Sequence, residues 1–217
     1  MAKNSNNRLD GFLNEARLLI DGARTDPTVA AQLTGFGYDA PALAAGKALH
    51  EEVLGLHAAQ KKEYGEQFEA TQALNAAWAE AEAPYLKSVK LARVVFRDDP
   101  KAWAALQLAG ERGRSLSAWL DQSTVFYRNL LGDPALLAAL AKVGLTRDKA
   151  VAEQALVQTV ADRQVAQRRE TGEAQEATEQ RDTKIAALDR WVQDFRAVAK
   201  VALGDRPQLL EKLGITA

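Results

Sequence analysis

The chain has 217 residues, of which 47% are hydrophobic and 26% charged, and its formal net charge is −1. This balance excludes the basic excess of a nucleic-acid-binding protein, and the lack of cysteine excludes disulfides and thiolate metal sites. The N-terminus shows no signal-peptide pattern and no apolar run is long enough to cross a membrane, so we expect a cytoplasmic protein without a transmembrane segment.

The first third of the chain reads as a series of helices. Residues 8–24 carry apolar side chains every three or four positions, which predicts an amphipathic helix. Asp26 is then followed by proline, a pair that favours a helix start, and Gly37 can take the left-handed conformation that ends a helix. From Asp39 a helical pattern continues to about Arg97. The sequence therefore predicts an all-α fold with short corner helices between longer ones.

The same order of signals returns 107 residues later. Asp26 and its proline align with Asp133-Pro134, and Gly37 aligns with Gly144. A second amphipathic helix is expected at residues 115–131, starting at Ser115 or Ser117, and Thr146 then begins a second long helix. Further short segments follow Asp99 and Asp205. We interpret this as a tandem duplication, with repeat units 1–110 and 111–217 forming one intertwined pseudo-symmetric structure.

Two structures fit each long segment. In the first, the chain turns at Gly65 and Gly172, giving a helical hairpin with a polar tip. In the second, each segment is one continuous helix of about 55 residues, roughly 80 Å long, and the glycines mark where two long antiparallel helices cross. The unbroken helical phase favours the continuous helix, with bundle or antiparallel coiled-coil-like packing. Pro84 predicts a kink in the first copy.

The two histidines, His50 and His57, are the weak candidates for metal ligands. They lie seven residues apart on one helical face, but neither has the Glu-x-x-His spacing of a di-iron site. The second copy has Val157 and Gln164 at these positions. We therefore expect surface or interface histidines and no cofactor. The alternative is a metal-binding or small-molecule-binding helical bundle, an enzyme among them, with both histidines lining its cavity.

The most distinctive repeated segment has the pattern Gln-basic-basic-Glu-x-Gly-Glu. It predicts ion pairs along a solvated helix or a partner-binding surface, carried by Lys61, Lys62, Glu66, Arg168, Arg169 and Glu173. The sequence shows no nucleophile motif, phosphate loop or other catalytic set. The function expected is thus that of a non-enzymatic scaffold or adaptor, which presents two similar surfaces to protein partners. A homodimer is compatible with the same pattern.

Overall fold

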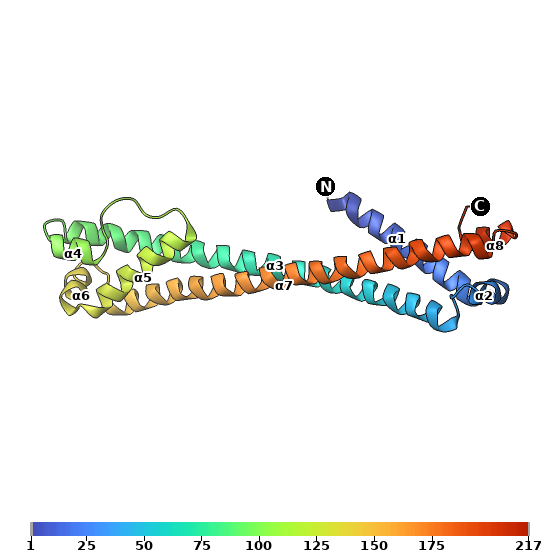
Figure 1. Cartoon of the computed structure of the whole chain (residues 1–217). Helices are drawn as coiled ribbons and strands as arrows, with labels where there is room; N and C mark the ends of the chain where they lie inside the picture. Colours follow the sequence, from blue (N-terminus) through green and yellow to red (C-terminus); the bar gives the residue numbers. More distant parts are fainter. Residues whose placement is uncertain (1, 217) are drawn as a thin grey trace. The chain divides into compact units, whose positions relative to one another are not determined.

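The computed structural model describes residues 2–216, with side chains from residue 8 onward. This part of the chain forms α-helices and no β-strand, which confirms the predicted all-α class (Figure 1). Among these residues, no helix combines the length and apolar character needed to cross a bilayer. The helices are α1 (Ala2–Thr25), α2 (Pro27–Thr34), α3 (Ala40–Val95), α4 (Pro100–Ala105), α5 (Leu116–Gly132), α6 (Pro134–Ala141), α7 (Arg147–Ala202) and α8 (Pro207–Lys212).

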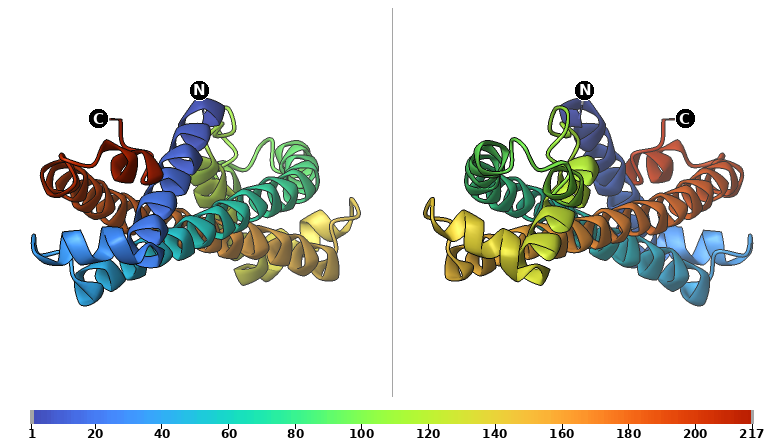
Figure 2. Two further views of the ribbon diagram at one scale, coloured as in Figure 1. Left: turned by 90° about the vertical axis from the view of Figure 1, so that its right-hand side faces the viewer. Right: turned by 90° about the vertical axis from the view of Figure 1, so that its left-hand side faces the viewer.

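The chain divides into two compact units. Unit 1 comprises Met1–Tyr64 and Glu173–Ala217, and unit 2 comprises Gly65–Gly172. Each unit thus combines parts of both predicted repeats, and the boundary predicted near residue 110 falls inside unit 2. Within each unit the short helices lie at the ends of the long ones, α2 beside the start of α3 and α6 beside the start of α7 (Figures 1 and 2).

Both long segments are continuous helices. Each has 56 residues, and Gly65 and Gly172 lie inside α3 and α7, so the hairpin alternative is wrong. Helix α3 also continues through Pro84 to Val95. A Cβ atom built at Gly65 or Gly172 would meet no described atom within 4 Å. Close packing therefore does not require glycine at either position.

Most of the predicted helix starts are confirmed. The carboxylates of Asp26, Asp99 and Asp133 each accept backbone N–H groups from the first turn of the helix that follows. Ser115, Asp39 and Thr146 likewise accept an N–H three residues later. A short helix also follows Asp205, as expected, but Asp205 does not cap it. Arg206 separates it from the proline, so Arg206 is the N-cap of α8 and makes no capping bond with its side chain.

The four short helices end in the same way. Each is followed by a residue with positive φ, which is glycine at three ends, Gly37, Gly144 and Gly214, and Gln107 at the end of α4. The N–H of the next residue then donates to a carbonyl five residues back, in the pairs Tyr38–Leu33, Leu108–Trp103, Leu145–Leu140 and Ile215–Leu210. This is the Schellman arrangement, which satisfies the last carbonyls and turns the chain back toward the core.

Each unit has its own hydrophobic core. In unit 1 the core includes Leu19, Val53 and Phe195, drawn from α1, α3 and α7. In unit 2 it includes Tyr85, Trp119 and several leucines of α5 and α6. The Tyr85 ring lies 5.8 Å from that of Trp119 in an edge-to-face contact, a geometry that stabilises aromatic pairs beyond their burial. The amphipathic helices predicted at 8–24 and 115–131 supply one wall of each core.

We predict that Gly65→Ala and Gly172→Ala each raise the free energy of unfolding by about 1 kcal/mol, because alanine is the better helix former and its methyl group meets open space. Urea unfolding followed by circular dichroism measures this. Gly46→Ala is the matched control. Its Cβ would collide with the Trp191 indole, so it should destabilise the protein. A loss of stability at Gly65 or Gly172 would contradict the open packing described above.

We also predict that Gln107→Gly stabilises the protein by about 1 kcal/mol, since a left-handed backbone costs a residue with a side chain about that much. The φ of Gln107 is 49°, and its hydrogen bonds in the turn are made by the backbone, which glycine retains. Differential scanning calorimetry should show a higher melting temperature. Gly144→Ala, at a position with φ of 88°, should lower it. An unchanged Gln107→Gly protein would argue against strain at this turn.

Candidate functional site

The histidines lie inside unit 1, between α1 and α3, and not on its surface. Their exposed fractions are 5% for His50 and 6% for His57. The Nε2 atom of His50 lies 2.9 Å from the carbonyl oxygen of Leu13 in α1. Of the two expectations, surface or interface, the surface one is therefore wrong, because α1 covers this face of α3. Neither ring belongs to a cluster of three metal-ligating side chains among the described residues.

His57 is a buried ring without a hydrogen-bond partner on either nitrogen among the described atoms. Burial lowers its pKa, and the charge of Lys61 adds to this, followed by that of Arg181. Asp10, whose carboxylate oxygen is 3.8 Å from Nε2, acts in the opposite direction. The neutral ring is thus the form that packs between α1 and α3.

The six residues of the predicted interaction surface lie near the middle of α3 and α7. Lys61, Lys62, Arg168, Arg169 and Glu173 are exposed, and Glu66 is half-buried. Lys62 Nζ lies 3.9 Å from Glu63 Oε1, and Arg169 Nη2 lies 2.6 Å from Glu170 Oε1. Both are ion pairs between sequence neighbours.

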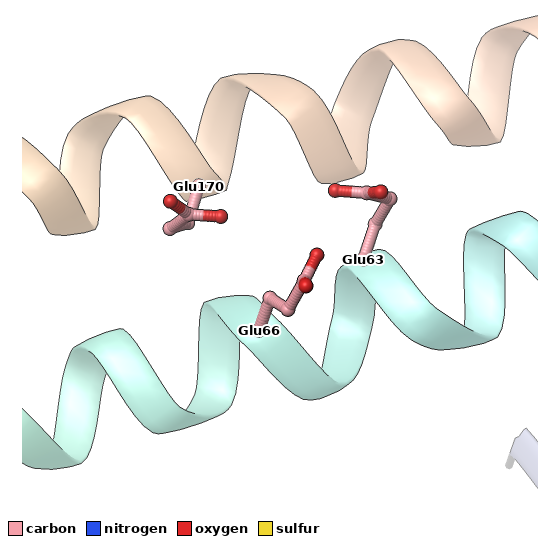
Figure 3. A group of neighbouring side chains, drawn as sticks. All are labelled: Glu63, Glu66 and Glu170. Atoms are coloured by element: carbon pink, nitrogen blue, oxygen red, sulfur yellow. The ribbon is translucent and has the colours of Figure 1, made fainter.

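Glutamates gather in the same stretch of the long helices. Glu66 on α3 and Glu170 on α7 both belong to unit 2, and their carboxylate oxygens come within 4.8 Å of each other (Figure 3). Glu63 precedes Glu66 by one turn on α3. Glu63 and Glu170 each lie beside a basic neighbour, as described above, so this group has cationic partners from the chain itself. We assign it no ligand.

Two aromatic residues were missed in the sequence. Tyr64 is 51% exposed and Phe68 is 63% exposed, and they lie one turn apart on α3. Lys61 precedes Tyr64 by three positions and shares the same face. The signal was available, since two aromatic side chains at i,i+4 stand in an otherwise polar segment. Thr171 and Gln175 occupy the equivalent positions of α7, so this feature belongs to α3 only.

A buried polar network joins three helices of unit 2. Ser88 of α3 and Tyr127 of α5 both donate a hydrogen bond to Glu153 Oε2 of α7, at 2.6 and 2.8 Å. Ser88 and Tyr127 are buried, and Glu153 is half-buried. Burial raises the pKa of Tyr127, and the Glu153 carboxylate adds to the effect. The phenol therefore keeps its proton and acts as a donor.

We predict that the stability of the protein falls more steeply below neutral pH than that of a His57→Gln variant. The folded state holds the pKa of His57 below its ordinary value of 6.5, so the unfolded chain binds the proton first as pH falls. The free energy of unfolding should therefore drop through that range. Urea unfolding at neutral pH and at about pH 5.5 tests this. Glutamine stands at the equivalent position of α7. Equal pH dependence in both proteins would show that protonation of His57 is not penalised.

Comparison with known proteins gives no further guide to the site. No family model matches the chain, and neither a curated protein sequence nor a solved structure matches it. Three separate features of the molecule are therefore the candidates for a function. They are the charged segments in the middle of α3 and α7, the exposed aromatic pair Tyr64 and Phe68, and the polar network around Glu153.

Proposed function

We propose that this chain is a non-enzymatic helical scaffold or adaptor that binds protein partners through exposed faces of its long helices. The observation that carries the proposal is the exposed pair Tyr64 and Phe68. Large aromatic side chains on a polar helix face are typical of protein interfaces, where they supply most of the binding energy. Lys61 and Lys62 beside them would form part of a polar rim.

The pair lies on a stripe that α1 covers further toward the start of α3. His57, one turn before Lys61, is buried near Asp10 of α1, whereas Tyr64 and Phe68 remain exposed. A helix face that α1 covers at His57 and that is exposed at Tyr64 and Phe68 leaves room for a second helix along it. The partner we propose is therefore an amphipathic helix whose apolar side meets Tyr64 and Phe68.

We also infer the tandem duplication of units 1–110 and 111–217. It is supported by the helix bounds, since α2, α3 and α4 begin and end 107 residues before α6, α7 and α8. Duplication would give two related surfaces, with basic pairs Lys61-Lys62 and Arg168-Arg169. Because it carries the aromatic pair, the α3 surface would bind a partner more tightly than the α7 surface. Bundle-like or coiled-coil-like pairing of α3 with α7 belongs to the same proposal.

We predict that a photo-crosslinking residue, p-benzoylphenylalanine, forms adducts with a partner protein in cells when it replaces Phe68. The matched control is the same replacement of Val94, which is also 63% exposed on α3. Adducts at residue 68 that mass spectrometry identifies as a different protein, and that weaken in a Tyr64→Ser background, would support the proposal.

Two outcomes would contradict it. Adducts of the chain with itself alone would mean that the face is a homodimer interface. Equal adducts at residues 68 and 94 would mean that the aromatic pair has no binding role. For an identified partner, light scattering of the complex gives the stoichiometry. One site for every partner would exclude the version with two surfaces.

A further inference from the structure

Unit 1 contains an aromatic cluster built over a glycine. The Trp191 ring stacks on Phe195 at a centroid distance of 5.3 Å, and Tyr38 meets both rings edge-on at 5.7 and 5.0 Å. Gly46 of α3 lies beneath the indole, where an added Cβ would come within 2.6 Å of ring atoms. Glycine is therefore required at this position, because the indole occupies the space directly against the helix backbone.

Unit 2 holds different side chains at the equivalent positions. At the 107-residue offset, Trp191 is replaced by Pro84, Phe195 by Ser88, Tyr38 by Leu145 and Gly46 by Glu153. Among the described residues, none of those that line this place is aromatic. The structure shows instead a groove with a volume of about 500 Å³, and these four replacements all line it. Small-molecule sites in proteins are commonly about 300–1,000 Å³.

The lining of the groove includes a polar part that hydrogen bonds hold in place. Glu153 lines the groove, and its Oε2 accepts hydrogen bonds from Ser88 and from the buried hydroxyl of Tyr127. Ile20, which has no hydroxyl, is the unit 1 counterpart of Tyr127. Unit 2 thus differs from unit 1 at Ser88, Tyr127 and Glu153 together. The two hydroxyl groups hold the Glu153 carboxylate in place. A carboxylate has room for about four hydrogen bonds, so it can accept another donor.

Another part of the lining is apolar and includes Pro84, Leu91 and Leu145. Lys87 and Lys149 also line the groove. The Nζ atom of Lys149 donates to the carbonyl oxygen of Gly144 at 3.0 Å, so its charge is directed at the turn after α6. The lining therefore combines apolar side chains with a carboxylate, which suits an aromatic ring that carries a hydrogen-bond donor.

We propose that this groove binds a small aromatic molecule of about the size of indole, with a ring N–H that donates to Glu153. Its ring would lie against Pro84 and Leu145, in the place that the chain's own indole takes in unit 1. The inference goes beyond the scaffold function and does not depend on it, since none of its residues belongs to the Tyr64–Phe68 face.

The test compares indole with 1-methylindole, which has the same ring without the N–H donor. Methyl resonances of ¹³C-labelled alanine report binding, because Ala83 and Ala152 line the groove. Indole should shift both signals and bind on the order of tenfold more tightly than 1-methylindole, as a charge-assisted hydrogen bond implies. Glu153→Gln should remove this preference, since its amide group can turn a donor toward the ring N–H. Equal affinities in the native protein, or no shift at either alanine, would overturn the proposal.

Two further arms keep the result interpretable. Pro84→Trp should abolish the indole-dependent shifts by filling the groove, and it should remain folded, because it removes a proline from a helix interior. Unchanged indole affinity in that variant would place the ligand elsewhere and overturn the proposal. N-acetyltryptophanamide represents the side chain of a partner protein. If it bound and indole did not, the occupant would be a protein segment and the small-molecule proposal would fail.

Discussion

The polar middle of the long helices is the constraint on which the rest of the structure depends. Among the described residues of α3, none between Val53 and Leu74 belongs to a hydrophobic core. An isolated helix gains little stability in water, and most of its stability comes from burying an apolar face. Each end of α3 and of α7 therefore needs its own partners. Helices α1, α2 and α8 provide them in unit 1, and α4, α5 and α6 in unit 2.

The two cores hold different chemistry at positions that lie 107 residues apart. In unit 1 the position of Gly46 allows the Trp191 indole to lie against α3, and the neighbouring rings complete an apolar cluster. In unit 2 Glu153 stands there, and Ser88 and Tyr127 satisfy one of its oxygens. Each arrangement is locally consistent, because a half-buried carboxylate requires donors and a stacked indole requires space. Mixing one residue from each solution would leave either a clash or an unsatisfied polar group.

Features set by neighbouring residues could be predicted from the sequence, and features set by distant ones could not. The caps at Asp26 and Asp133 depend on two or three residues, and both were found. Asp205 looked equivalent, but at the 107-residue offset it corresponds to Asp98, and Arg206 stands at the capping position that Asp99 holds before α4. Gly65 and Gly172 were ambiguous, because glycine marks turns and is also tolerated in helices at a cost of about 1 kcal/mol.

The same contrast between neighbouring and distant residues applies to the candidate site residues. The burial of His50 depends on α1, whose Leu13 lies 37 positions away, and no local pattern contains that information. The network of Ser88, Tyr127 and Glu153 likewise joins three helices. Tyr64 and Phe68 were within reach of sequence reasoning, because their spacing and polar surroundings are visible without a structure.

The division of the chain into units has a consequence for synthesis. Unit 2 is one uninterrupted stretch, Gly65–Gly172, whereas unit 1 joins the two ends of the chain. On the ribosome, unit 2 has all its residues well before unit 1 does. The apolar faces of α1 and α2 can pack fully only after the C-terminal part of α7 has been made. These helices are therefore synthesised before unit 2 but reach their final packing after it. During that interval it carries exposed apolar surface, the kind of surface that chaperones bind and that promotes aggregation.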